Sequence, residues 1–239
     1  MADQRNIPQK SFFTRAYHRA FTMGALRPHA KSLLPYLNRP GGRFVEIGAR
    51  DGVKESLTPF LEKALGWKGI LIEPWPHLFH RCRKRRKSSL CLNVAATEPQ
   101  LRDSYIELVG LPPAASVRRK LMQEARDRAE GKPIQPLKPG AKPPKRVSYV
   151  STNSLAGILG RANFEEHFDL MVFNLPGYEA HALEGMDFDA YKPTFLLIRT
   201  VGADVKLPHL PPYYQRITES KHDQQSAFHL FRYSDFGEN

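Results

Sequence analysis

Residues 44–52 read Phe-Val-Glu-Ile-Gly-Ala-Arg-Asp-Gly, a short apolar run that ends near an acid and enters a loop with two glycines. Gly48 and Gly52 let the backbone turn sharply and let a ligand approach where a Cβ would clash. The G-x-x-x-G spacing matches neither the dinucleotide fingerprint G-x-G-x-x-G nor the phosphate loop G-x-x-x-x-G-K-[ST]. We therefore expect a strand, a glycine loop and a helix, with a ligand site at the carboxyl end of the strand.

Strand and helix signals alternate along the rest of the chain. Strands are expected at residues 43–47, 69–72, 90–95, 147–150, 170–173 and 194–198. Helices are expected at residues 54–65, 76–86, 153–159 and 176–186. Two β-rich runs, 213–218 and 227–233, predict a terminal antiparallel pair. This order predicts an α/β fold with a mostly parallel sheet and helices on both faces.

Two regions lie outside this alternation. Residues 10–37 mix Phe and Leu with basic residues in a loosely helical pattern that we expect to break at Pro28 and Pro35. We interpret residues 1–40 as a helical cap on a main domain at 41–239; the alternative is a basic amphipathic helix that contacts a membrane. Residues 111–146 contain seven of the 20 prolines, which indicates a basic Pro-rich insertion.

Length and composition exclude several classes of protein. The chain has 239 residues, 41% of them hydrophobic, which fits one large domain or at most two small ones. No apolar run approaches the roughly 18 residues of a membrane-spanning helix, and no apolar segment follows the first charges. The two cysteines cannot make a disulfide framework or a four-cysteine metal site. We expect a soluble, cytoplasmic protein without a metal.

The net charge of +12 indicates an acidic partner and is concentrated in two segments. Residues 81–87 contain six basic residues and no acid, and residues 118–146 contain ten basic residues against three acids. The segments could clamp a phosphate-rich ligand or an anionic membrane, or could be a solvated helix end and a cationic loop. Aromatic residues are scarce in both, which argues against stacking on single-stranded nucleic acid, and we expect no DNA partner.

The second expected strand ends in Glu73, about twenty residues beyond the glycine loop. An acid at this place can accept hydrogen bonds from ribose hydroxyls, so the pair of features favours a ligand that contains adenosine. Alternatively, Glu73 is an ordinary strand-end carboxylate paired with a neighbouring Arg.

Several ordered blocks resemble the FkbM family of S-adenosylmethionine-dependent methyltransferases. The blocks are E-I-G-A-R-D-G at 46–52, L-G-W-K-G at 65–69, I-E-P at 72–74, N-V-A-A at 93–96 and L-P-G-Y-E with A-L-E-G-M at 175–186. The resemblance covers residues 42–233 apart from the insertion. It implies a Rossmann-like domain with a seven-stranded, mostly parallel sheet, S-adenosylmethionine as cofactor, and O-methylation of a sugar hydroxyl in a polysaccharide, glycolipid or natural product.

The resemblance also implies a cofactor pocket. Glu46, Gly48, Ala49 and Gly52 would hold the methionine part, Glu73 and Pro74 would lie at the ribose, and Asn93 and Val94 would flank the adenine. The remaining pocket positions are Arg50, where the family commonly has Asn, and Ser56. Ser56 and Thr58 together match a Ser/Thr pair at the expected helix start.

The chain departs from the family where chemistry would occur. The family usually has Asp-x-Glu-Gly-x-Glu after its fourth strand, whereas this chain has Asn174-Leu-Pro-Gly-Tyr-Glu179. Ala156 and Arg199 likewise stand where the family has acids. Among the remaining groups, Glu179 and His181 could deprotonate a hydroxyl, and Asn174 could orient one; alternatively, His181 lies on an exposed helix face. The departures fit an acceptor with anionic groups or a catalytically silent binding protein, and an RNA-directed methyltransferase is a third reading.

Overall fold

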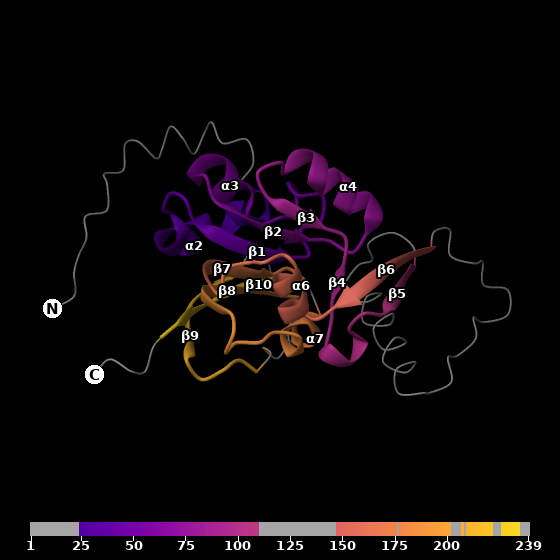
Figure 1. Ribbon diagram of the computed structural model, residues 1–239. Coiled ribbons are helices and arrows are strands. Elements are labelled where there is room, and N and C mark those ends of the chain that lie inside the picture. The colour runs from indigo at the N-terminus through magenta and orange to yellow at the C-terminus, as the bar shows by residue number, and fades with distance from the viewer. Residues whose placement is uncertain are drawn as a thin grey trace.

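The structure, a computed structural model, describes residues 24–109, 147–175, 177–201, 207, 209–221 and 226–234. The first part of the expected cap, up to residue 23, and the insertion at 111–146 lie outside the described residues. The described part is an α/β fold in which helices cover both faces of a central sheet, as Figure 1 shows.

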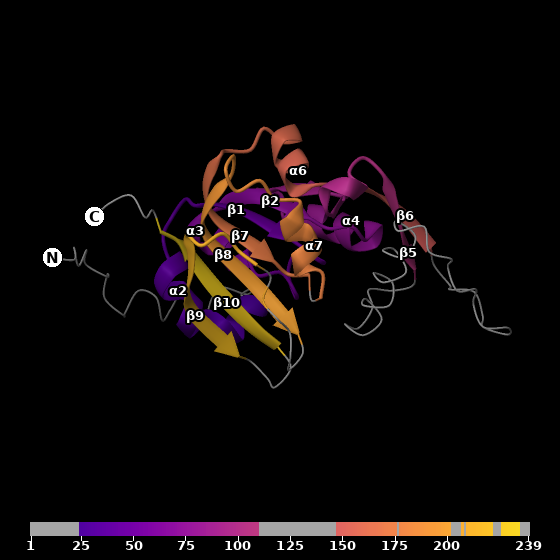
Figure 2. The same cartoon turned by 90° about the horizontal axis from the view of Figure 1, so that it is seen from below.

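The central sheet has seven strands in the order β3-β2-β1-β7-β8-β10-β9. Their bounds are Arg43–Ile47 for β1, Lys68–Ile72 for β2, Leu90–Leu92 for β3, His167–Phe173 for β7, Lys192–Val201 for β8, Tyr214–Lys221 for β9 and Ser226–Tyr233 for β10. The neighbours from β3 to β8 are parallel, whereas β10 runs antiparallel to both β8 and β9 (Figure 2). The expected mostly parallel sheet and its C-terminal antiparallel pair are confirmed.

A second sheet branches from the end of β3. It contains β4 (Ala95–Ala96), β6 (Val147–Asn153) and β5 (Tyr105–Val109), and the β5–β6 hairpin projects from the body (Figures 1 and 2). A short helix, η2 (Pro99–Leu101), joins β4 to β5. The prediction of one strand over residues 90–95 was wrong, because Asn93 Nδ2 bonds the carbonyls of Glu73 and Pro74 between two short strands. Beyond this point β4 pairs with β6.

The helices divide between the two faces of the sheet. η1 (Gly24–His29), α2 (Ala30–Leu37), α3 (Pro59–Leu65) and α4 (Pro76–Arg85) lie on one face, and α6 (Leu155–Arg161) and α7 (Glu179–Glu184) on the other (Figure 1). Each face has its own apolar core, because alternate residues of a strand point to opposite sides. Phe44 packs in the core with α2 and α3, whereas Val45 packs in the core with α6 and α7.

Two expected helix positions differ from the structure. The helix predicted over residues 54–65 begins at Pro59, because residues 56–58 are held by side-chain bonds to Glu46 instead of entering a helix. The helix predicted from residue 153 begins at Leu155, where the Ser154 hydroxyl accepts a hydrogen bond from the Gly157 amide and caps the first turn.

Residues 24–37 pack directly on the sheet. Leu26, Leu33 and Leu37 are buried in the same core as Phe44 and Phe228. The predicted breaks at Pro28 and Pro35 were wrong, since both prolines lie inside helical segments that bury these leucines. The apolar face of this region is therefore used inside the protein and is not available to a lipid surface. None of the helices in the described part of the chain combines the length and apolar composition needed to span a bilayer.

Candidate active site

The glycine loop, residues 48–58, follows β1 at the carboxyl edge of the parallel strands. β1 lies between β2 and β7, so the loop opens at the point where the strand order reverses, which is where open α/β sheets bind ligands. The amides of Gly48 and Ala49 bond the Ile72 carbonyl at 2.9 and 3.1 Å. Gly48 has φ 83°, and a Cβ there would lie 2.3 Å from the Asn174 carbonyl oxygen. Glycine is required here by the close approach of β7.

Glu46 has its whole carboxylate inside the protein. It lies on the same side of β1 as Phe44 and is 0% exposed. Its Oε2 accepts hydrogen bonds from the Ser56 and Thr58 hydroxyls, both at 2.7 Å, and its Oε1 accepts one from the Leu57 amide at 2.8 Å. Glu46, which the resemblance places at the methionine part of the cofactor, thus bonds Ser56 and Thr58, the pair expected at the helix start, and holds the loop in this structure.

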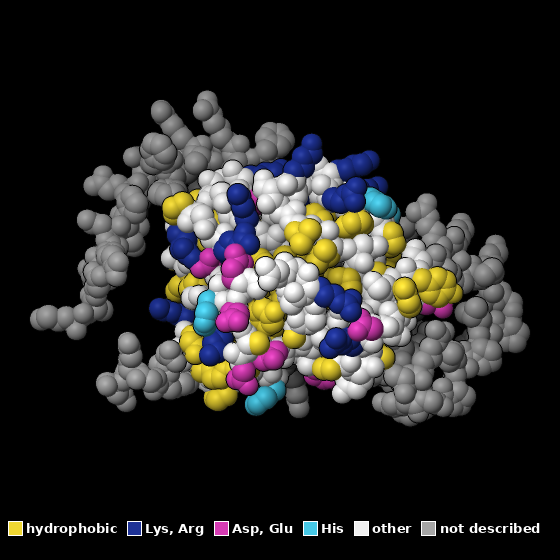
Figure 3. Space-filling view, in the orientation of Figure 1, with side chains coloured by type: hydrophobic (Ala, Val, Ile, Leu, Met, Phe, Trp, Pro, Cys, Tyr) yellow, Lys and Arg dark blue, Asp and Glu magenta, His cyan; other side chains and the backbone are white. Residues whose placement is uncertain are grey.

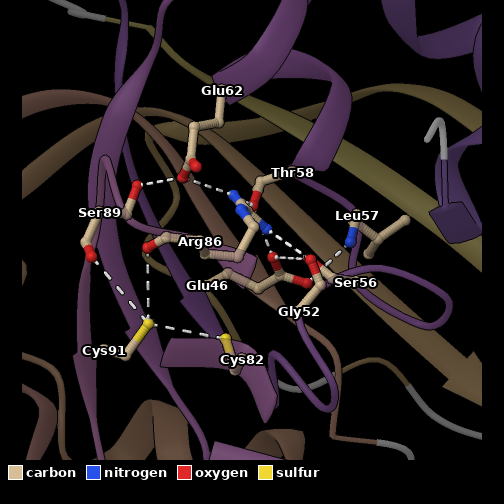
Figure 4. Close-up of polar contacts among 10 residues, drawn as sticks. All are labelled: Glu46, Gly52, Ser56, Leu57, Thr58, Glu62, Cys82, Arg86, Ser89 and Cys91. Carbon is tan, nitrogen blue, oxygen red and sulfur yellow. Dashed lines mark hydrogen bonds and ion pairs between the residues drawn. The ribbon is translucent and has the colours of Figure 1, made fainter. Parts of the chain in front are cut away.

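Arg86 completes this buried network, drawn in Figure 4. It is 0% exposed, and its guanidinium reaches four partners: the Gly52 carbonyl at 3.1 Å, Ser56 Oγ at 3.1 Å, Thr58 Oγ1 at 2.9 Å and the Glu62 carboxylate at 3.0 Å. Gly52 has φ 77°, and a Cβ there would lie 2.9 Å from Arg86 Cγ. The expectation that residues 81–87 form one basic surface is therefore wrong for Arg86.

The other basic residues of the 81–87 segment do lie at the surface. Figure 3 shows Lys and Arg side chains gathered over α4, and Arg81, Arg83, Lys84 and Lys87 are exposed. Arg85 bonds the Asp51 carboxylate at 2.6 Å, which ties the helix to the glycine loop. Part of the basic segment thus supports the loop, and four exposed cations remain for an anionic partner.

The two cysteines lie at the edge of the buried network. Sγ of Cys82 on α4 is 3.7 Å from Sγ of Cys91 on β3. The hydrogen bond to Cys91 and burial raise the pKa of the Cys82 thiol. The hydrogen bond from Cys82 and the nearby Arg86 lower the pKa of Cys91 against the opposing effect of burial. Cys91 is therefore the thiol of the pair that ionises first.

Glu73 lies beside the glycine loop, at the end of β2. It is 1% exposed; its Oε2 accepts the Arg50 amide at 2.7 Å and its Oε1 accepts the Trp75 amide at 3.0 Å. Asn93, at the end of β3, donates to the Glu73 and Pro74 carbonyls, both at 2.9 Å. The structure thus brings together Glu73, Pro74 and Asn93, with the half-buried Val94 next along the chain.

Arg50 and Asp51 give the glycine loop its local shape. Arg50 has φ 57°, in the left-handed region that Asn tolerates better than Arg, and its side chain pairs with Glu55 at 2.9 Å. Burial acts to raise the pKa of Asp51, but hydrogen bonds from the Val53 and Lys54 amides and from Arg85 outweigh it, so the pKa lies below its usual value.

Asn174, at the end of β7, is buried and bonded on both sides of its amide. Its Nδ2 donates to the Gly48 carbonyl at 3.1 Å and the Glu55 carbonyl at 2.8 Å, and its Oδ1 accepts from Arg199 Nη1 at 3.2 Å. Through these contacts Asn174 links the glycine loop to Arg199 on β8 in this structure.

His181 lies with two residues that the sequence analysis did not single out. Its Nδ1 is 3.7 Å from Glu98 Oε2, the Tyr178 hydroxyl is 3.5 Å from the same oxygen, and the two rings are 4.8 Å apart. The His181 side chain is 13% exposed, so the alternative of an exposed helix face is wrong. Glu179 lies on the same helix, and its Oε2 accepts the Gly177 amide at 2.9 Å.

The residues that the sequence analysis missed carried weak signals. Glu98 follows the block 93–96, and the end of a strand is where catalytic groups are sought, so it could have been found. Arg86 could not, because a run of basic residues gives no indication that one member turns inward. Among the described residues, no three metal-ligating side chains of the His, Cys, Asp or Glu type come together.

The site fits a ligand with an adenosine and a cationic amino-acid part. The Glu73 carboxylate lies beside the glycine loop at the switch point, where its oxygens accept the Arg50 and Trp75 amides. The Glu98 carboxylate, near α7, adds negative charge, whereas the charge of Glu55 is balanced by Arg50. Carboxylates favour a positively charged ligand.

A family model described as the methyltransferase FkbM domain matches residues 46–231. No match is found among curated proteins.

Similar solved structures have low identity to this chain. A conserved hypothetical protein of Streptococcus pyogenes has 12% identity and a TM-score of 0.46, with 86% of this chain and 93% of that chain covered. A putative methyltransferase of Escherichia coli has 10% identity and a TM-score of 0.44, with coverage of 87% and 83%. A SAM-dependent methyltransferase of Aquifex aeolicus has 10% identity and a TM-score of 0.41, with coverage of 87% and 89%.

Proposed function

Because the chain belongs to the FkbM methyltransferase family, we propose that it transfers a methyl group from S-adenosylmethionine to a hydroxyl of a saccharide or glycoconjugate. S-Adenosylmethionine is the cofactor of the family, and when bound it supplies an electrophilic methyl group. The observation that carries the choice of a hydroxyl acceptor is the cluster of Glu98, Tyr178 and His181, which supplies a base held in place by a carboxylate.

The residues of the chain divide this task. Glu73 would hold the ribose, and the loop from Gly48 to Gly52, with Pro74, Asn93 and Val94, would form the rest of the cofactor pocket. His181 would take the proton of the acceptor hydroxyl at Nε2, because its Nδ1 faces Glu98. Glu98 would stabilise the charged imidazole that results, and Tyr178 would fix its plane. Asn174 and Glu179, the other expected catalytic groups, would hold the loop and the start of α7 in place.

The exposed cations of residues 81–87 support an acceptor with anionic groups. Arg81, Arg83, Lys84 and Lys87 offer positive charge without an acid among them. A phosphorylated or acidic glycan would gain from this charge, which also raises the rate of encounter.

Calorimetric titration with S-adenosylhomocysteine tests the cofactor assignment. We expect binding by the native protein and a loss of at least tenfold in affinity for Glu73→Ala, because Glu73 is the buried acid next to the loop. Glu165→Ala is the control, since Glu165 pairs with Arg43 at the start of β1, away from the carboxyl ends of the strands. No binding by the native protein would rule out the assignment.

Single-turnover assays with labelled S-adenosylmethionine and a panel of neutral and phosphorylated saccharides test the reaction. We expect His181→Gln to lower the rate about 100-fold or more with unchanged affinity for S-adenosylhomocysteine. His167→Gln, at an exposed position at the start of β7, should keep the native rate. A native protein that binds the cofactor but methylates no member of the panel would favour the catalytically silent alternative, and methylation of RNA alone would favour the third reading.

A further inference from the structure

Arg86 is a charged side chain with no exposed surface, and its four partners come from two different elements. Nη1 reaches the glycine loop through the Gly52 carbonyl and Ser56, and Nη2 reaches the start of α3 through Thr58 and Glu62. Because the guanidinium is planar and rigid, its two ends fix the distance between loop and helix.

The hydroxyls of Ser56 and Thr58 connect Arg86 to Glu46 on β1. Each hydroxyl accepts a hydrogen bond from Arg86 and donates its proton to Glu46 Oε2 (Figure 4). A hydroxyl has a single proton, so both hydroxyl orientations are determined by this arrangement. Chains of hydrogen bonds of this kind strengthen one another in a buried site.

The network surrounds a guanidinium that is 0% exposed, so the protein itself must supply every partner of Arg86. A buried charge needs its partners, and removal of Arg86 would leave the hydroxyls of Ser56 and Thr58 without the donor they accept from. Glu62 would lose its ion pair and keep only the hydrogen bond from Ser89. Three of the four partners, Gly52, Ser56 and Thr58, lie in residues 52–58. We therefore expect the backbone of this segment to change its path when Arg86 is removed.

We propose that Arg86 is a positioning residue for methyl transfer, which holds residues 52–58 in the shape that binds the cofactor without touching the cofactor itself. The inference rests on the proposed function, because the loop is assigned there to the cofactor. In this proposal Arg86 supports the cofactor-binding loop, whereas the exposed basic residues of 81–87 contribute only surface charge.

Four single variants separate positioning from general stability. Arg86→Met removes the charge and the donors, and Arg86→Lys keeps the charge but cannot reach both ends of the network. Arg83→Met is the matched control on the same helix, because Arg83 is exposed and contacts the ring of Phe79. Glu62→Gln weakens the ion pair with Arg86 and leaves its loop contacts in place.

Affinity for S-adenosylhomocysteine is measured well below each variant's unfolding midpoint. We expect Arg86→Met to weaken binding at least tenfold and Arg86→Lys to fall between it and the native protein. Arg83→Met should stay within twofold of native affinity, and Glu62→Gln, which loosens one of the four contacts, should weaken binding less than Arg86→Met does. Native affinity in both Arg86 variants would overturn the proposal, whatever their stability.

Amide hydrogen exchange of the free protein gives a readout that needs no ligand. We expect faster exchange at the Leu57 amide and its neighbours in 52–58 for Arg86→Lys, with exchange in β1 and β7 unchanged. Uniformly faster exchange over the sheet would show a general structural role and overturn the proposal. If the native protein does not bind S-adenosylhomocysteine, the proposed function fails, and local exchange still decides whether Arg86 sets the shape of the loop. If Arg86→Met does not fold, Arg86→Lys and Ser56→Ala carry the test, and Ser56→Ala should weaken binding in the same direction.

Discussion

Asn174 Oδ1 accepts a hydrogen bond from Arg199 Nη1 at 3.2 Å, across the ends of β7 and β8. These are two of the positions at which the chain departs from the acids usual in the family. Because the two side chains contact each other, the departures form one change of the site and not two independent losses. Arg199 donates to the amide oxygen of Asn174, so the amide nitrogen of Asn174 points to the loop carbonyls and donates to them.

We predict that Asn174→Asp destabilises the protein at pH 7. An ionised carboxylate has no donor for the Gly48 and Glu55 carbonyls, so both would lose their partner. The expected loss in the free energy of unfolding is about 1–3 kcal/mol, measured by denaturant titration. A double-mutant cycle with Arg199→Met checks the pairing: the loss should be larger without Arg199, and equal losses would show that the two side chains do not interact.

Gly48→Ala should be far more damaging than the same change at another glycine with positive φ. A Cβ at 48 would lie 2.3 Å from the Asn174 oxygen, whereas one at Gly66, with φ 71°, would meet nothing within 4 Å. Gly66→Ala should cost about 1 kcal/mol from the backbone alone. Thermal unfolding and binding of S-adenosylhomocysteine measure the difference; similar losses at both positions would contradict the close contact between the loop and β7.

Arg50→Asn should stabilise the free protein. Asn tolerates the left-handed conformation at φ 57° better than Arg does. The free energy of unfolding should therefore rise by up to about 1 kcal/mol. Glu55→Gln breaks the same Arg50–Glu55 ion pair without changing the backbone, so it serves as the control in denaturant titrations. A loss of stability in Arg50→Asn that matches the loss in Glu55→Gln would show that the ion pair outweighs the strain.

Stability should fall at low pH partly through Asp51. Its pKa in the folded protein lies below the ordinary value of about 3.9. Its contribution is therefore complete above that value and is lost as the pH falls through the lowered folded pKa. Asp51→Asn should be less stable than native by about 1 kcal/mol or less at pH 7 and equal to it at the lowest pH.

Asp187→Asn is the matched control for the loss of a carboxylate that accepts two backbone amides, measured at pH 7. Asp187 Oδ1 accepts two backbone amides, from Asp189 and Ala190, as Asp51 Oδ1 does from Val53 and Lys54. If the free energy of unfolding of Asp51→Asn runs parallel to that of the native protein at every pH down to the acid transition, the lowered pKa of Asp51 is contradicted.

Most of the fold could be predicted from the sequence because its signals are local. The apolar run at 43–47 became β1 with the expected bounds, and the parallel order followed from the alternation of strands and helices. The late start of α3 at Pro59 could not be predicted, since it depends on Glu46, a residue ten or more positions away that bonds residues 56–58. The division of residues 90–95 likewise depends on the long-range contacts of Asn93.

The candidate site was less accessible to sequence reasoning. Glu73 and Gly48 could be found because strand ends and glycines have characteristic spacing. The place of Glu46 beside the loop could be predicted, but its bonds to Ser56, Leu57 and Thr58 could not. Arg86 was hidden in a run of basic residues whose buried and exposed members the sequence cannot separate. His181 was found from its chemistry, whereas its partner Glu98 is contributed by a segment 83 positions earlier.

The ends of the β5–β6 hairpin have a practical consequence. Val109 and Val147 face each other as antiparallel partners, so the chain leaves the described part and returns to it at nearly the same place. A two-residue turn such as Asn-Gly can span such partners. Replacing residues 110–146 by this turn should yield a shorter chain that keeps both sheets but carries seven fewer of the twelve net positive charges. Such a minimal version would show directly whether cofactor binding and recognition of an anionic acceptor are separable properties of the molecule.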